Sequence, residues 1–305
     1  MHLPDITISL ERLVVVKRPR YRLMIGTLLT LTLFYFMFTA IATNPAFGWP
    51  IAKSYLFNST ILKGLWQTLT LTITIMAASI FIGALIAIMR LSSSKILNSF
   101  AAAYIWFFRG TPALLQLIFW FNLSIVVREL SLTLPFIGTL FAIKTNDFMT
   151  PFFSAVIALS LHEAGYMAEI IRAGIKSVPT GQSEAASSLG MHPALVMKRI
   201  IMPQAMRFIV PPTGNETINL LKMTSLVTFI AVDDLLYAAQ SIYARTFETI
   251  PLLAVVAFWY LSVVTVLTIV QYFIEKYYGR SDFRPQPILF NVFAIFQTKK
   301  IISAA

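Results

Sequence analysis

Cysteine is absent from the 305 residues of this chain, and only 12% of the residues are charged. Without cysteine the chain can form neither a disulfide framework nor a thiolate metal site. About a quarter of the residues in a soluble globular domain are charged, whereas here 57% are hydrophobic and the mean hydropathy is +0.76. The composition therefore predicts a protein that crosses a membrane several times, not one held by a single anchor.

Two common chemical motifs are also missing. No glycines have the GxxxxGK spacing of a phosphate-binding loop, so the chain does not bind a nucleotide by that route. His162 and Glu163 begin a zinc-peptidase pattern, but Tyr166 stands where the second histidine would have to be, and the other histidines are His2 and His192. We therefore expect no catalytic residues, no metal site and no cofactor bound by this chain.

Apolar runs long enough to cross a bilayer as helices need about 20 residues. The third predicted span contains Arg109-Gly110-Thr111-Pro112, where glycine and proline weaken a helix. The first span has a rival interpretation as a signal peptide, since Ala40-Ile41-Ala42 resembles a cleavage site, but its apolar run is longer than a signal core. The six predicted spans are Leu23–Ala42, Leu62–Met89, Ile96–Val127, Pro151–Ile175, Phe208–Val232 and Ile250–Ile274, with outer loops at 44–60, 128–150 and 233–249.

The distribution of positive charge predicts which segments face the cytoplasm. The net charge is +11, and in a membrane protein such an excess reflects Lys and Arg on the cytoplasmic side rather than a nucleic-acid partner. With the amino terminus inside, the cytoplasmic segments hold Lys17, Arg18, Arg20, Arg22, Arg90, Lys95, Arg172, Lys176, Lys198, Arg199, Arg207, Lys276 and Arg280. The outer loops hold only Lys53, Lys63, Arg128, Lys144 and Arg245. We expect a cytoplasmic amino terminus.

The segment Ser183–Pro203 is moderately polar and lies between two of these apolar spans. Thr180 can cap a helix start, Glu184 falls in the first turn, and Gly190 can close the helix. Proline is a good first helical residue, so Pro193 is expected to begin a second short helix. The pattern predicts two short cytoplasmic helices with a bend between them.

This segment resembles the EAA loop of the permease subunits of bacterial ABC importers. The matching residues are Glu184, Ala185, Ala186, Gly190, Ile200 and Pro203, with Met202 in place of the usual leucine. In that family the loop, here 177–203, is a coupling helix that docks into a groove on a separate ATP-hydrolysing subunit. The resemblance implies that the docking contacts are made by Gly181, Gln182, Glu184, Ala185, Ala186, Leu189 and Gly190.

Three further runs are similar to the permeases for polar amino acids of the histidine/glutamine/arginine type: Tyr104–Gln116, Tyr166–Gly181 and Asn219–Leu226. The resemblance implies an all-α, polytopic fold of the type I ABC importer permease class, with a five-helix core at 62–274. It also implies a bacterial inner-membrane location, a second permease subunit (identical or homologous), two ATPase subunits that bind ATP and Mg, and an external solute-binding protein. It does not cover the arm 1–22, the extra helix 23–42 or the tail 275–305.

The fifth predicted span carries Asn215, Asn219 and Lys222 on one helical face, with Glu216 beside them. An ionisable side chain at membrane depth costs roughly 2.5 kcal/mol or more unless it has a partner or water. One interpretation is a Glu–Lys pair that only joins helices. The other is a helix that lines a polar translocation path.

The fourth predicted span adds Glu163 and Tyr166, and its Glu169–Arg172 pair is predicted to be a packing salt bridge. An amino acid needs hydrogen-bond donors for its carboxylate and acceptors for its ammonium group. Lys222, Arg109 and the two asparagines are candidate donors, and Glu163, Glu216 and the hydroxyls are candidate acceptors. The candidate path residues are Arg109, Thr111, Gln116, Glu163, Tyr166, Asn215, Glu216, Asn219, Lys222, Thr224 and Ser225.

We therefore predict a permease of an ATP-driven importer of polar amino acids that works by alternating access. The main alternative is an ion-coupled secondary transporter that uses Glu163 or Glu216, although the two halves show no clear repeat of the kind such proteins often have. A channel or proton-driven energy transducer using Glu216 or Lys222 is a third possibility. A membrane enzyme is disfavoured because no nucleophile–base pair is present. Which amino acid is carried stays open.

Overall fold

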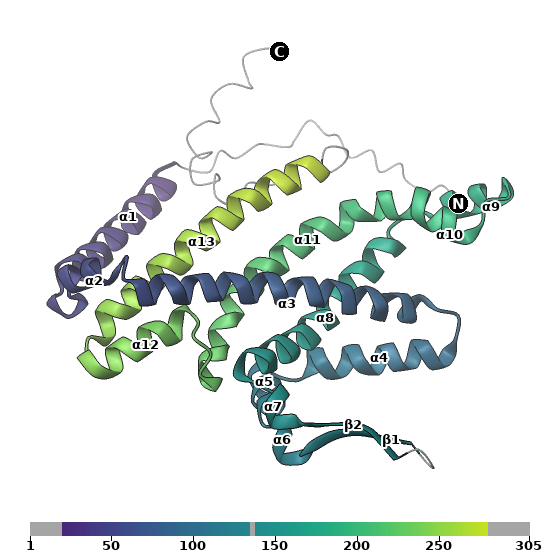
Figure 1. The fold of residues 1–305 in the computed structure, drawn as a ribbon. Helices are drawn as coiled ribbons and strands as arrows, with labels where there is room; N and C mark the ends of the chain where they lie inside the picture. Colours follow the sequence, from purple (N-terminus) through teal and green to yellow (C-terminus); the bar gives the residue numbers. More distant parts are fainter. Residues whose placement is uncertain (1–19, 135–137, 280–305) are drawn as a thin grey trace, which may run out of the picture. The chain divides into compact units, whose positions relative to one another are not determined.

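A computed structural model describes residues 20–134 and 138–279 (Figure 1). The chain divides into two compact units, 1–49 and 50–305. The predicted arm 1–22 and tail 275–305 lie mostly outside the described residues.

The first unit is built around α1 (Arg20–Thr43), followed by a 3₁₀ turn (Pro45–Phe47). Asn44 caps this turn, because its side chain accepts a hydrogen bond from the amide of Ala46 at 2.9 Å. Residues Met24–Thr43 are long and apolar enough to cross a membrane, and none of this stretch is buried against other residues. An apolar helix with no polar face is suited to lipid on all sides.

The second unit is mainly helical, which agrees with the predicted fold class. Its elements are α2 (Trp49–Tyr55), α3 (Ser59–Leu91), α4 (Lys95–Gly110), α5 (Ala113–Phe121), α6 (Leu123–Val126), β1 (Glu129–Leu134), β2 (Gly138–Lys144), α7 (Thr145–Phe148), α8 (Pro151–Lys176), α9 (Thr180–Ser188), α10 (Pro193–Val196), a π-helical turn (Met197–Ile201), α11 (Met202–Met223), a 3₁₀ helix (Thr224–Ile230), α12 (Leu235–Thr246) and α13 (Thr249–Tyr278).

Helix α8 is the central helix of this unit, since α3, α4, α5 and α11 all pack against it. Leu159 and Met167 on α8 are fully buried. Gly83 lets α3 approach α8 closely, because a Cβ there would lie 2.6 Å from the Cβ of Met167. The hydroxyl of Ser160 on α8 donates to the carbonyl of Ile75 on α3 at 3.4 Å, so polar as well as apolar contacts join the two helices.

A second hydrophobic cluster joins α3 to α12 and α13. Ile61, Leu235 and Leu252 are fully buried in it. Asp234 caps α12, since its carboxylate accepts from the amide of Tyr237 at 2.8 Å. The outer segment 233–249 is therefore mostly helix rather than the predicted loop.

Two other predicted elements differ from the structure. The third span is not one helix, because the helix stops after Gly110 and restarts at Ala113 beyond Pro112. The outer segment that follows is not a plain loop: β1 and β2 form an antiparallel hairpin in which Glu129 pairs with Lys144. Figure 1 shows this hairpin and α9 at opposite ends of α8.

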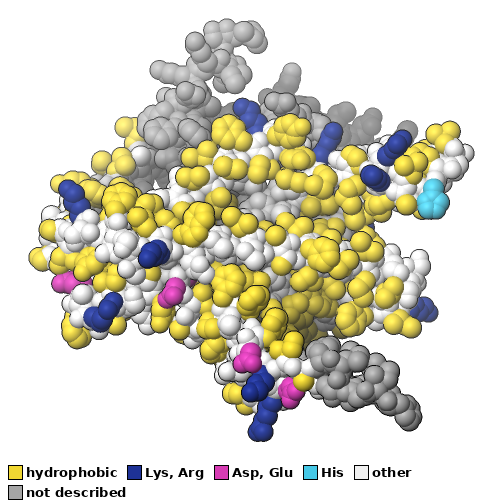
Figure 2. All heavy atoms as spheres, in the orientation of Figure 1, with side chains coloured by type: hydrophobic (Ala, Val, Ile, Leu, Met, Phe, Trp, Pro, Cys, Tyr) yellow, Lys and Arg dark blue, Asp and Glu magenta, His cyan; other side chains and the backbone are white. Residues whose placement is uncertain are grey.

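Within 20–134 and 138–279, three helices are long and apolar enough to cross a membrane: α1, α3 and α13. Helices α8 and α11 have 26 and 22 residues, or about 39 and 33 Å at 1.5 Å per residue, which also matches a bilayer. Figure 2 shows hydrophobic side chains over most of the visible face. Exposed apolar surface of this extent is typical of a protein surrounded by lipid or by partners.

Candidate functional site

The segment between α8 and α11 folds into a hairpin, which we call the α9 hairpin (Thr180–Ile201). Gly190 has a left-handed backbone, with φ +75°, and donates its amide to Ser187 O at 2.9 Å, while the amide of Met191 donates to Ala186 O at 3.2 Å. These two bonds form a Schellman motif, so the predicted role of Gly190 is confirmed. The predicted cap is wrong: α9 begins at Thr180 itself, after Pro179, and has no side-chain cap.

The return half of the hairpin begins as predicted at Pro193, with the ring of His192 accepting from the amide of Ala194 at 3.3 Å. It does not end as a separate short helix. The helix continues through the π-helical turn, which contains Lys198 and Arg199, directly into α11. The hairpin is thus joined rigidly to α11, and to α8 by the short link 177–179.

Ala186 is the one predicted coupling residue that α9 buries, with 3% of its surface exposed. Small residues occupy the rest of α9, and Leu189 at its end is 83% exposed. The other predicted coupling residues are all exposed: Gly181, Gln182, Glu184, Ala185 and Gly190. Since a single alanine holds α9 against its neighbours, most of its surface is free for another molecule.

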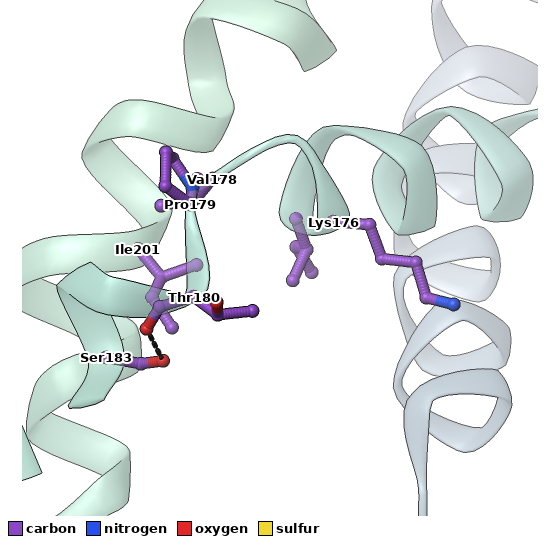
Figure 3. Close-up of a pocket in the computed structure, with 7 residues that line it drawn as sticks. Lys176, Val178, Pro179, Thr180, Ser183 and Ile201 are labelled. Carbon is purple, nitrogen blue, oxygen red and sulfur yellow. Dashed lines mark hydrogen bonds between the residues drawn. The ribbon is translucent and has the colours of Figure 1, made fainter.

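A cavity of about 390 Å³ lies at the base of α9. Figure 3 shows Thr180 and Ser183 on the α9 side, joined by a hydrogen bond from the Ser183 hydroxyl to Thr180 O at 2.7 Å, and Lys176 extending away from them. The cavity is lined by Ile175, Lys176, Val178, Pro179, Thr180, Ser183 and Ile201. It therefore separates the end of α8 from the start of α9.

Four polar side chains of the candidate path region meet where the third predicted span breaks. The buried Gln116 Nε2 donates to Thr111 Oγ1 at 2.6 Å and to Phe108 O at 2.9 Å, and lies 3.1 Å from His162 Nδ1. The His162 ring lies 5.5 Å from that of Tyr166. The sequence analysis considers His162 only as a metal ligand and does not predict its contacts with Gln116 and Tyr166. Its position one turn before Tyr166 was the available signal.

Arg109, at the end of α4, lies over the face of Tyr166, with 4.9 Å from Cζ to the ring centroid. Gly165 allows this approach, because a Cβ there would lie 3.1 Å from Arg109 Cγ. A guanidinium over an aromatic ring is held by a cation–π interaction. The structure thus brings Tyr166 of α8 together with Arg109, Thr111 and Gln116, which lie about 50 residues earlier around the break between α4 and α5.

Glu163 lies one residue beyond His162 on α8 and is buried, with 3% of its surface exposed. Its Oε1 atom has no hydrogen-bond partner among the described residues. Glu216 on α11 is half-buried and close enough to act on Glu163 electrostatically. Burying a carboxylate oxygen without a partner reduces the free energy of unfolding. The packing of the described residues gives no structural reason to bury Glu163 beside Glu216, so this pair of acids is a candidate functional feature.

The predicted polar face of α11 is exposed at Asn215, Asn219 and Lys222. Within the described part of the chain Glu216 and Lys222 form no ion pair, so the interpretation of a Glu–Lys pair joining helices is not supported. Asn215 Nδ2 instead donates to Glu275 Oε1 on α13 at 3.4 Å. The predicted packing salt bridge does form, with Arg172 Nη2 at 2.6 Å from Glu169 Oε2.

Thr224 and Ser225 begin the 3₁₀ helix after α11. Thr224 is fully buried and its hydroxyl donates to Leu221 O at 2.7 Å, while the Ser225 hydroxyl donates to Lys222 O at 2.8 Å. Both hydroxyls are thus occupied within their own turn in this conformation.

Comparison with known proteins bears on this arrangement. Residues 79–279, about two thirds of the chain, match the family model of the binding-protein-dependent transport system inner membrane component. The chain is 41% identical to the arginine transport system permease protein ArgU of Corynebacterium glutamicum, over 82% of this chain and 78% of that protein. It is 34% identical to the L-cystine transport system permease protein TcyB of Bacillus subtilis, over 78% and 94% of the two chains.

Solved structures agree with this assignment. A crystal structure of an amino acid ABC transporter with histidines matches with a TM-score of 0.61 and 33% identity, over 72% of this chain and 94% of the other. An inward-facing structure of the methionine ABC transporter MetNI shares the fold at 15% identity, with a TM-score of 0.59 over 72% and 96% of the two chains. This chain therefore belongs to the binding-protein-dependent transport system inner membrane components, as a permease of an amino-acid ABC transporter in which a separate subunit hydrolyses ATP.

Proposed function

We propose that this permease imports polar amino acids with a cationic side chain, which a solute-binding protein delivers from outside the cell. The relative ArgU is named for arginine transport. The observation that carries the proposal is the buried Glu163, whose Oε1 has no partner in the part of the chain that the structure describes, with Glu216 nearby. Two carboxylates in one region suit a guanidinium or ammonium group, because charge-assisted hydrogen bonds are the strong ones.

The other candidate path residues suit the remaining parts of such a substrate. Arg109 lies over the face of Tyr166, and the N–H groups of its guanidinium can donate to the substrate carboxylate. The exposed Asn219 and Lys222 offer further donors along α11. Membership in this family disfavours the ion-coupled secondary transporter, for which the same acids would be ion sites.

We infer that the α9 hairpin is the contact with the ATPase. Its exposed face of small residues can enter a groove, and its direct connection to α11 and short link to α8 carry its movement into the membrane. The complex then contains this permease, a second identical or homologous permease, two ATPase subunits with ATP and Mg, and the binding protein. Closing of the ATPase pair drives alternating access.

The proposed location is a bacterial inner membrane, with the amino terminus in the cytoplasm. The positive-inside rule supports this orientation, because Arg90, Lys176 and Lys276 lie in the last turns of α3, α8 and α13, and α8 leads directly into the α9 hairpin. The first apolar helix, α1, then crosses outward.

The test is uptake by the complete complex in proteoliposomes, with the binding protein and radiolabelled arginine outside and ATP inside. We expect uptake to require ATP, and Glu163→Gln to lower it about tenfold, the loss of roughly one charge-assisted hydrogen bond. The ATPase subunits should still copurify with this variant. Normal uptake by Glu163→Gln would remove the acid from the path, and competition by uncharged polar amino acids alone would contradict the cationic substrate.

A further inference from the structure

Helix α11 contains two prolines near its middle, Pro211 and Pro212. Proline has no amide hydrogen, so two of the bonds to carbonyls four residues earlier cannot form. Helices bend at such places. The Thr213 hydroxyl, directly after the prolines, donates to Ile209 O at 2.8 Å. The prolines divide α11 into a segment next to the α9 hairpin and a segment that carries Glu216 and Asn219.

The segment before the prolines is held to α8. Gly174, near the end of α8, lies so close to α11 that a Cβ there would overlap the side chain of Ile209 and lie 3.3 Å from Ala205 O. Ala205 and Ile209 are both buried in this contact. The end of α8 and the start of α11, into which the α9 hairpin continues, are therefore packed against each other.

At the prolines, α11 is held from the other side by α13. Gln271 is only 5% exposed, and its Nε2 donates to Pro211 O and to Glu275 Oε1, both at 2.8 Å. Glu275 Oε1 also accepts from Asn215 Nδ2 at 3.4 Å. Gly214 makes room for this arrangement, because a Cβ at that position would overlap the Gln271 carboxamide.

We propose that Gly214, Gln271 and Glu275 form a clamp that fixes where α11 bends during transport. The clamp holds the proline-containing turn against α13. Movement of the α9 hairpin then shifts Glu216 and Asn219, and is not taken up by bending at varying positions along α11. Gln271 is a positioning residue, since it acts through its hydrogen bonds to the backbone of α11 and to Glu275. The proposal rests on the proposed role of the α9 hairpin as the contact with the ATPase.

The first measurement is the number of amino acids imported per ATP hydrolysed by the reconstituted complex. Gln271→Met keeps the size of the side chain and removes both hydrogen bonds. Gly214→Ala places a methyl group on α11 where the Gln271 carboxamide now lies. We expect each to lower the ratio about two- to thirtyfold, the range found for residues that carry coupling between sites. The KM for the loaded binding protein should not change. Tyr272→Phe, at the exposed neighbour of Gln271, is the matched control.

The second measurement follows the bend itself. The chain has no cysteine, so Phe208→Cys and Phe229→Cys can carry two spin labels without background. Both phenylalanines are exposed. Phe208 lies on α11 before the prolines, and Phe229 lies beyond them in the 3₁₀ helix that follows α11. With the native clamp we expect a sharp change of distance between the nucleotide-free and ATP-trapped complexes. With Gln271→Met we expect a broad distribution that changes little.

A purely structural role would lower the yield of complex but leave both the ratio and the change of distance intact in the complex that forms. The clamp is wrong if Gln271→Met and Gly214→Ala both give the native ratio and the native change of distance. Failure of the wild-type permease to copurify with an ATPase would instead remove the proposed function. Copurification therefore separates the two failures.

Discussion

The α9 hairpin and the polar interior around α8 and α11 differ in which of their hydrogen-bonding groups have partners. The hairpin closes its own bonds through Gly190 and Met191 and leaves its side chains exposed. The interior buries Glu163 on α8 and Gln116 on the adjoining α5, but leaves Glu163 Oε1 and Gln116 Oε1 without partners among the described residues. A buried polar atom without a partner costs about 1–3 kcal/mol. The difference indicates that the hairpin is a preformed docking surface, whereas the interior is a binding site whose polar atoms still need a ligand.

Reversing the charge on the hairpin should have the largest effect. Glu184 is exposed on α9, so Glu184→Lys should not disturb the fold, yet a misplaced charge in a docked interface costs several kcal/mol. We expect ATP-dependent uptake to fall at least about tenfold. Copurification of the ATPase and uptake in proteoliposomes measure the two steps. Gln240→Lys, exposed on α12, makes the same kind of substitution away from the hairpin. Normal coupling in Glu184→Lys would show that this surface is not the docking site.

A change inside the path should have a smaller effect and should act on substrate recognition. Gln116→Leu keeps the side-chain volume but removes the donors to Thr111 Oγ1 and Phe108 O and the contact with His162. The segment between α4 and α5, which follows Arg109, is then held by fewer hydrogen bonds. We expect a loss of about 1–3 kcal/mol in stability, a lower melting temperature and a several-fold higher KM. Gln240→Leu should change neither, and an unaltered KM in Gln116→Leu would assign Gln116 to stability alone.

Local rules were enough to predict the hairpin from the sequence. Gly190 closes α9 and Pro193 opens the return helix because backbone geometry at these positions depends on few neighbours. The continuation through Met197–Ile201 into α11 could not be predicted, since a π-helical turn depends on packing around it. The sequence analysis also did not predict the hairpin of β1 and β2. The alternating apolar residues there lie in a short outer segment, which the analysis assigns to a loop.

The interior was only partly predictable, for the opposite reason. Helical periodicity placed Asn215 and Asn219 on one face of α11, but it could not show that Asn215 turns to Glu275 on α13. Partners that lie 60 residues apart follow from tertiary packing alone. For the same reason Gln271 carried no signal in the sequence, although it holds α11 at Pro211.

The smallest predicted effect tests whether the hairpin is as self-contained as its bonds indicate. A Cβ on Gly190 would meet nothing within 4 Å, so Gly190→Ala acts only through the left-handed backbone at φ +75°. That conformation costs a residue with a side chain about 1 kcal/mol more than glycine. Amide hydrogen exchange in α9 should then rise about fivefold, while the rest of the unit is unchanged. Gly181→Ala also meets nothing within 4 Å but has no positive φ. Since alanine favours a helix more than glycine does, this change should not raise the exchange of α9. Equal exchange in the two variants would mean that neighbouring structure, and not the Schellman motif, holds the hairpin.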